Sequence, residues 1–146
     1  MASLEREQAR RSRSQRRVLV VDDEAANREL VSTMLACEGF DIVTAQDGLD
    51  ALAQLEVALP DLIISDLRMP KMSGVEFLSI VRQRHPIIPI IMISGEFEGN
   101  EVPPGVVPPG VSADAYLPKG QYTLNQLRTT VTNLLTETPG EPAQTQ

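Results

Sequence analysis

The sequence predicts an α/β fold in which helices cover both faces of a parallel β-sheet. Short apolar segments alternate along the chain with longer segments whose apolar residues recur at helical spacing. Several of the short segments are apolar without interruption, which is typical of strands buried on both faces of a parallel sheet. Strands that alternate with helices in this way indicate a sheet with helices on both sides.

Each expected element is marked by its own pattern and by the residues that end it. Strands are expected at 17–22, 41–45, 62–66, 89–94 and 115–118. Apolar residues at helical spacing predict helices within 30–39, 49–59, 75–84 and 124–135. Gly39 stops the first helix and Pro60 closes the second.

The composition limits the class of protein. The chain has 146 residues, of which 42% are hydrophobic and only 3% aromatic, so one domain with an aliphatic core is expected. No apolar segment approaches the length that crosses a bilayer, and the charged N-terminus lacks an apolar signal segment. The single cysteine, Cys37, excludes an internal disulfide and is expected to be a small core residue. Together these features favour a cytoplasmic protein without membrane partners.

The two ends differ in composition from the segment between them. Residues 1–17 carry a net charge of +4, which leaves −11 for the remainder of a chain whose total is −7. A basic arm could contact nucleic acid or an acidic partner. We favour a disordered arm over 1–16 without direct nucleic-acid binding, because it has no aromatic or periodic feature. The domain is expected over 17–136, followed by a disordered tail over 137–146.

Polar side chains stand where the expected strands end. Asp22 and Asp23 end the first strand, Asp66 ends the third, Ser94 ends the fourth, and Lys119 follows the fifth. Ligands of open parallel sheets bind beyond the carboxyl ends of the strands, so these groups are expected to meet. Three carboxylates in one pocket cannot all stay ionised without a cation, and Mg²⁺ suits oxygen ligands beside phosphate.

Each of these residues also has a purely structural interpretation. Asp22 or Asp23 could cap the following helix, and Asp66 could be a turn residue. Lys119 could be a solvated loop lysine. The functional interpretation is favoured because the structural one requires several coincidences at once.

Five motifs occur in a specific order along the chain. They are VVDDE at 20–24, DLIISD at 61–66, MPKMSG at 69–74, ISG at 93–95 and ADAYLPK at 113–119. In this order and at these intervals they resemble the receiver domains of two-component response regulators. The resemblance covers residues 17–136. It implies a flavodoxin-like, doubly wound sheet with strand order 2-1-3-4-5. It also implies a histidine kinase or a histidine phosphotransfer protein as phosphoryl donor.

The resemblance implies roles for individual residues. Asp66 would be the phosphoacceptor, Asp23 a direct ligand of Mg²⁺ and Asp22 a ligand through water. The backbone carbonyl of Arg68 would be a further ligand. A carboxylate is a competent nucleophile towards phosphorus, so the domain would catalyse its own phosphorylation and slow dephosphorylation without being an enzyme otherwise.

The resemblance also implies groups that sense the phosphoryl group. Ser94 would hydrogen-bond one phosphoryl oxygen, and Lys119 would pair with another. Phosphorylation would draw Ser94 inward and let Tyr116 turn into the vacated space.

Two departures from the family pattern are present. Gly120 follows Lys119, where proline is usual. Residues 96–111 contain four prolines and three glycines where the family normally has a helix between the fourth and fifth strands. Proline inside a helix costs roughly 3 kcal/mol, so the helix is expected to be absent or replaced by a proline-rich loop.

The expected function is a phosphoacceptor that switches protein–protein interactions. Because only a short polar segment follows Leu135, the protein is expected to act alone or in a phosphorelay, by binding an unknown output protein. One alternative is a pseudo-receiver that binds a partner without phosphorylation. Another is a haloacid-dehalogenase-like phosphatase, which would need Asp-x-Asp after its first strand, where this chain has the adjacent pair Asp22-Asp23.

Overall fold

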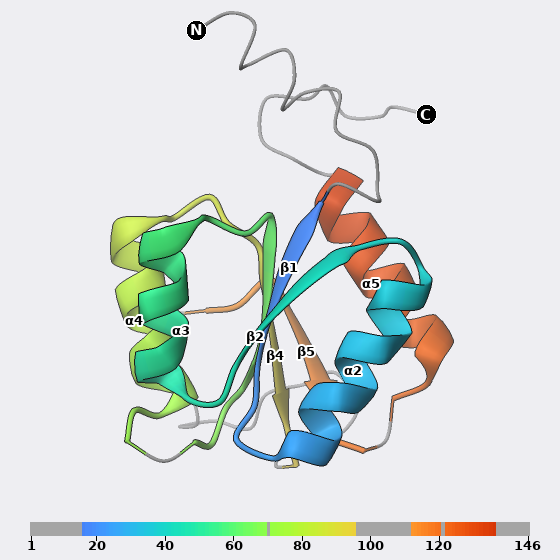
Figure 1. Ribbon diagram of the computed structural model, residues 1–146, viewed down its shortest axis with the longest axis horizontal. Helices are drawn as coiled ribbons and strands as arrows, with labels where there is room; N and C mark the ends of the chain where they lie inside the picture. The colour runs from blue at the N-terminus through green and yellow to red at the C-terminus, as the bar shows by residue number, and fades with distance from the viewer. Residues whose placement is uncertain (1–15, 70, 96–111, 121, 137–146) are drawn as a thin grey trace, which may run out of the picture.

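A computed structural model describes residues 16–69, 71–95, 112–120 and 122–136 (Figure 1). Its elements, in chain order, are β1 (Arg17–Val21), α2 (Ala25–Cys37), β2 (Asp41–Ala45), α3 (Gly48–Val57), β3 (Leu62–Asp66), α4 (Gly74–Arg84), β4 (Ile90–Ser94), β5 (Ala115–Pro118) and α5 (Leu124–Thr136). The five strands form one parallel sheet in the order β2-β1-β3-β4-β5. The expected fold class and strand order are therefore confirmed.

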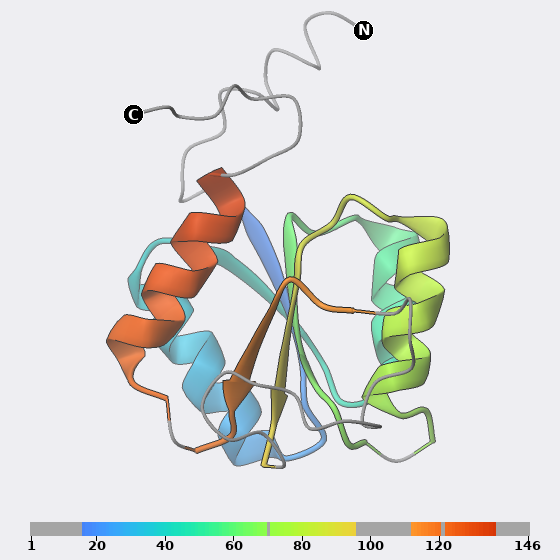
Figure 2. The same ribbon diagram turned by 180° about the vertical axis from the view of Figure 1, so that it is seen from behind.

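The helices form a layer on each side of the sheet. Helices α2 and α5 cover one face, and α3 and α4 cover the other (Figures 1 and 2). Successive strand residues point to opposite faces. In β1, Val18 and Val20 therefore join the core cluster under α2 and α5, while Leu19 and Val21 join the cluster under α3 and α4. Strands β3 and β4 are buried along their whole length, as their continuous apolar sequences predict.

Local capping fixes where the helices begin. The Asp47 side chain accepts a hydrogen bond from the Asp50 amide at 2.8 Å and starts α3. Ser73 and Glu76 form a reciprocal capping box at the start of α4, with both hydrogen bonds at 3.1 Å. At the other end of α2, Gly39 has a φ of 99°, which suits glycine and ends the helix where expected.

Two apolar side chains of α2, Leu30 and Cys37, are exposed, and for Cys37 this differs from the expectation. The helix buries Val31 and Leu35, whereas Leu30 is 53% exposed because it lies beside the buried stripe rather than within it. Cys37 stands at the C-terminal end of the helix and is a free, exposed thiol. The expectation that Cys37 is a core residue is therefore wrong, since helical spacing places Cys37 on the side of α2 that faces away from the buried Val31 and Leu35.

Several sequence-based expectations fall outside the described residues. These are the absence of a helix over 96–111 and the disorder of the arm up to residue 15 and of the tail over 137–146. Arg16 is described and is bound to the sheet and to α5. Its carbonyl accepts from the Asp41 amide at 2.9 Å, and its guanidinium donates to the Leu135 carbonyl at 3.2 Å. Among the described helices, none is both long and apolar enough to span a bilayer.

Candidate functional site

Three carboxylates meet at the C-terminal edge of the sheet. Each of Asp22, Asp23 and Asp66 offers an oxygen that lies within 4.8 Å of the others. Strand pairing brings them together, because Val21 at the end of β1 lies opposite Ser65 in β3. Asp22 and Asp66 are buried, with 6% and 4% exposure, while Asp23 is open to solvent. The meeting of these groups is as expected from the sequence.

Lys119 brings a positive charge into this cluster from the end of β5. Its ammonium lies 2.7 Å from an Asp66 carboxylate oxygen, 2.8 Å from a Glu24 oxygen and 3.9 Å from an Asp22 oxygen. The Lys119 amide donates to the Ser94 carbonyl at 2.9 Å, which fixes the start of the loop after β5 to the end of β4. Lys119 is therefore shared among several acids rather than paired with one.

The electrostatics of the cluster favour a bound cation. Burial raises the pKa of Asp22 to about 6, and the charges of Asp66 and Asp23 act in the same direction. The hydrogen bond from the Glu24 amide and the charge of Lys119 oppose this rise in the pKa. Burial alone would lower the pKa of Lys119, but its hydrogen bonds to Asp66 and Glu24 outweigh burial and raise it. Lys119 in turn lowers the pKa of Glu24. Lys119 therefore stays charged, while the ionised form of Asp22 is disfavoured.

Backbone contacts hold Asp66 in place. The Arg68 amide donates to an Asp66 carboxylate oxygen at 3.3 Å, and the Leu67 amide donates to the Ile93 carbonyl at 2.9 Å. The turn after β3 closes with a 2.8 Å hydrogen bond from the Gly74 amide to the Leu67 carbonyl. A Cβ atom on Gly74 would lie 2.7 Å from Leu67 Cα and even nearer to the Asp66 carbonyl oxygen. Only glycine fits at this close approach of backbones.

Ser94 and Tyr116, the two residues expected to form the switch, lie on neighbouring strands at different distances from the C-terminal edge. Ser94 is 2% exposed and lies opposite Pro118, next to the carboxylate cluster. Tyr116 is half-buried against the core under α3 and α4. Its hydroxyl accepts a hydrogen bond from the Ala113 amide at 2.8 Å. Ala113 precedes β5, so the tyrosine ring points towards the N-terminal end of that strand.

Other charged residues that the sequence did not predict also take part at this edge. Glu24 belongs to the first motif but was assigned no role, although its position directly after the two aspartates was a signal. Arg28, one turn into α2, donates to the Asp22 carbonyl at 2.6 Å. Lys71 lies 3.6 Å from the buried carboxylate of Asp47 and has a φ of 69°. No local pattern identifies the contacts of Arg28 and Lys71, because both depend on the path of the chain around the strand ends.

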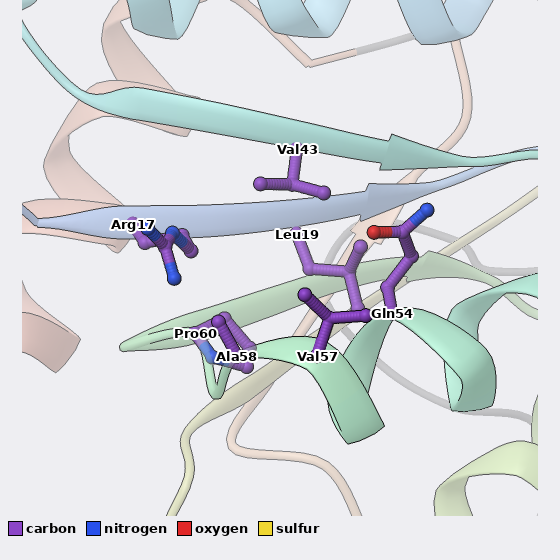
Figure 3. A pocket seen from close by; sticks show the side chains of 7 residues that line it. All are labelled: Arg17, Leu19, Val43, Gln54, Val57, Ala58 and Pro60. Atoms are coloured by element: carbon purple, nitrogen blue, oxygen red, sulfur yellow. The ribbon is translucent and has the colours of Figure 1, made fainter.

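A small cavity lies at the opposite, N-terminal edge of the sheet. It has a volume of about 190 Å³ and lies between β1, β2 and the end of α3 (Figure 3). Its lining is mostly aliphatic and comprises Arg17, Leu19, Val43, Gln54, Val57, Ala58 and Pro60. The cavity lacks the clustered acids of the C-terminal edge.

Comparison with known proteins identifies the family. The family model of the response regulator receiver domain matches residues 18–132. The transcriptional regulatory protein PhoP of Bacillus subtilis, named for alkaline phosphatase synthesis, is 36% identical over 104 residues, covering 71% of this chain and 42% of PhoP. The response regulator MprA of Mycobacterium sp. strain KMS is 33% identical over 134 residues, covering 88% of this chain and 56% of MprA. The chain thus spans about half the length, or less, of these curated relatives.

Solved structures agree with the sequence relatives. The chemotaxis response regulator CheY4 of Vibrio cholerae is 34% identical with a TM-score of 0.71, and the match covers 82% of this chain and 98% of CheY4. The response regulator TrrA of Thermotoga maritima, solved in complex with Mg²⁺ and BeF, is 32% identical with a TM-score of 0.69, covering 82% and 99%. The chain therefore belongs to the response regulator receiver domain family, the signalling domains of two-component systems.

Proposed function

We propose that Asp66 accepts a phosphoryl group and that this modification switches the binding of another protein. The observation that carries the proposal is the position of the Asp66 carboxylate. It is buried, lies 2.7 Å from the Lys119 ammonium and shares its surroundings with two further carboxylates. A carboxylate in such a setting is a suitable nucleophile once its charge is offset by cations.

The carboxylate cluster suits Mg²⁺, a hard cation that prefers oxygen ligands and retains water. We propose Asp23 and Asp66 as direct ligands, together with the backbone carbonyl of Arg68, and Asp22 as a ligand through water. Bound Mg²⁺ would offset the charge on the oxygens of the transferring phosphoryl group. The TrrA structure with Mg²⁺ and BeF is a precedent in a relative.

The transfer step needs few moving groups. An Asp66 carboxylate oxygen forms a bond to phosphorus while the phosphorus–nitrogen bond of a phosphohistidine donor breaks, and the leaving imidazole takes up a proton. Lys119 exchanges part of its contact with Asp66 for a phosphoryl oxygen, and the Ser94 hydroxyl hydrogen-bonds another. Attack of water on the same phosphorus later returns Asp66 and inorganic phosphate. The domain thus promotes its own phosphorylation and slow dephosphorylation.

The donor and the output of the proposed switch are protein partners. We propose a histidine kinase or a histidine phosphotransfer protein as donor, in the cytoplasm, and an output protein that recognises the phosphorylated form. PhoP is a transcriptional regulator, but we propose no nucleic-acid contact for the described residues of this chain. The arrangement of an arm over 1–16, a domain over 17–136 and a tail over 137–146 remains part of the proposal.

Labelling with a small phosphodonor tests the assignment of Asp66. Incubation with acetyl phosphate and Mg²⁺ is expected to add one phosphoryl group that is labile in alkali, and Asp66→Asn is expected to prevent it. Asp41→Asn is the matched control, because Asp41 is exposed at the opposite edge, where it forms a 3.4 Å ion pair with Arg17. Equal labelling of Asp66→Asn and the parent would refute the assignment. A parent that is not labelled at all would favour the pseudo-receiver alternative.

Metal titration tests the proposed ligands. Asp23→Ala is expected to weaken Mg²⁺ binding more than Asp22→Ala, because it removes a charged direct ligand rather than one that acts through water. Calorimetric titration measures both affinities. Unaltered Mg²⁺ affinity in Asp23→Ala would rule out the proposed site.

A further inference from the structure

One arginine of α4 binds the chain on both sides of Ala113. The Arg82 guanidinium donates to the Ser112 carbonyl at 3.1 Å and to the Asp114 carboxylate at 2.7 Å. The Arg82 side chain is 22% exposed, so these contacts are partly shielded from water. Ser112 and Asp114 flank Ala113, so one side chain binds both neighbours of Ala113, while the Asp114 amide also donates to the Ile90 carbonyl at 2.8 Å.

The same guanidinium also binds the segment that leads into β4. It donates to the Ile88 carbonyl at 2.9 Å, and the Asp114 carboxylate accepts a second hydrogen bond from the Ile90 amide at 2.8 Å. A planar guanidinium with several fixed donors suits such a junction, which a lysine could not reproduce. Together with the two hydrogen bonds between Asp114 and Ile90, Arg82 therefore fixes the start of β5 relative to the start of β4.

Ala113 connects this junction to Tyr116. The Ala113 amide donates to the Tyr116 hydroxyl at 2.8 Å. Tyr116 lies opposite Met92, whereas Ser94 lies opposite Pro118, further towards the C-terminal edge. The hydrogen bond thus holds the tyrosine hydroxyl at the end of β5 that is remote from Ser94. If Tyr116 turns towards Ser94, this hydrogen bond must break.

We propose that Arg82 is a positioning residue that holds Tyr116 away from Ser94 and so stabilises the resting state of the switch. This inference rests on the proposed function and on the turn of Tyr116 towards Ser94 that the resemblance to receiver domains implies. Arg82 acts only through Ala113, because its contacts fix the two neighbours of the amide that binds the tyrosine. A contact present in one state and absent in the other shifts the balance between them.

Binding of beryllofluoride with Mg²⁺, measured by calorimetry, tests the inference in the full chain. Tyr116→Phe keeps the ring and loses the hydroxyl, so it is expected to raise beryllofluoride affinity by about fivefold, the effect of one ordinary hydrogen bond. Arg82→Met is expected to give a similar increase. The double variant is expected to bind no more tightly than the tighter of the two single variants, because both changes remove the same restraint.

Arg84→Met is the matched control on the same helix. Arg84 is 56% exposed and lies 3.9 Å from Glu56, itself 76% exposed, so its removal is expected to leave beryllofluoride affinity unchanged. If Arg82→Met does not fold, Asp114→Asn weakens the same junction with a smaller change and is expected to raise the affinity in the same direction. Unchanged affinity in the folded junction variant, or effects that multiply in the double variant, would overturn the inference.

Hydrogen exchange of the Ala113 amide separates this inference from the proposed function. In the protein without beryllofluoride, Tyr116→Phe and Arg82→Met are each expected to accelerate this exchange by about fivefold or more, and Arg84→Met is not. Unchanged Ala113 exchange in Arg82→Met would overturn the inference even if beryllofluoride binds normally. Failure of the parent to bind beryllofluoride, with accelerated exchange in the variants, would refute the proposed function and leave Arg82 without a switch to control.

Discussion

The two edges of the sheet are built from the same strands but differ in the number of charged side chains that they bring together. At the C-terminal edge, Asp22 and Asp66 are buried together and share Lys119 with Glu24. At the N-terminal edge, a mostly aliphatic cavity has a single charged residue, Arg17, in its lining. Buried like charges destabilise a fold unless a partner compensates them. The C-terminal edge therefore suits the proposed binding of a cation, whereas the cavity at the N-terminal edge is lined mainly by apolar side chains.

The charged groups near the cavity have nearby hydrogen-bond or ion-pair partners. Arg17 makes a 3.4 Å ion pair with Asp41 in which both side chains are well exposed, and such a pair contributes little. The Arg17 amide donates to the Asp61 carboxylate at 2.8 Å. Since the described residues form no cluster of acids at this edge, substitutions at the two edges are expected to have different effects on stability and on cation binding.

The largest effect is expected at the turn that holds Asp66. Gly74→Ala would place a methyl group against the backbone of Leu67 and Asp66, so stability is expected to fall by about 3 kcal/mol or more. Mg²⁺ binding is expected to weaken with it, because Asp66 would have to move. Gly95→Ala is the control, since its new Cβ would meet no atom of the described residues within 4 Å. Urea unfolding measures the stability of the two variants. Equal stabilities of Gly74→Ala and Gly95→Ala would show that the turn accommodates the added methyl group.

The next effect concerns the charge of Asp22 in the absence of metal. Its pKa is raised from 3.8 to about 6 in the folded protein, so the folded state holds a proton that the unfolded state has lost. The stability of the EDTA-treated protein is therefore expected to fall as the pH rises from about 4 to 6, by about 2 kcal/mol after allowance for solvent. Asp22→Asn is expected to remove this dependence and to be more stable than the parent at pH 7 without Mg²⁺. Urea unfolding across this pH range measures the effect. A parent protein that gains stability as the pH rises would contradict this prediction.

Sequence patterns predicted the fold and the main site because both depend on local signals. Strands at 62–66 and 115–118 were expected at their observed bounds, since apolar segments ending in turns define them. The meeting of Asp22, Asp66 and Lys119 followed from their positions at the carboxyl ends of parallel strands, whereas the strand order came from the family resemblance. In contrast, the Arg82 junction joins residues 30 and 32 positions apart, and nothing in the local sequence indicates its partners. Helical spacing likewise identified the apolar side of α2 but not that Leu30 lies outside its buried stripe.

The smallest effect is expected at the N-terminal edge. Val43 lines the cavity, so Val43→Ile would add one methylene to a space of about 190 Å³ and is expected to stabilise the protein by about 0.5–1 kcal/mol. Val57→Ile is the matched control, because Val57 is on the rim and 82% exposed, and it is expected to change stability little. Neither variant is expected to change Mg²⁺ or beryllofluoride affinity, since the cavity lies at the edge opposite the carboxylates. Thermal unfolding and calorimetric titration measure the two properties separately. A stabilised Val43→Ile with altered beryllofluoride affinity would mean that packing at one edge is coupled to charge at the other, and the division between the edges would then be wrong.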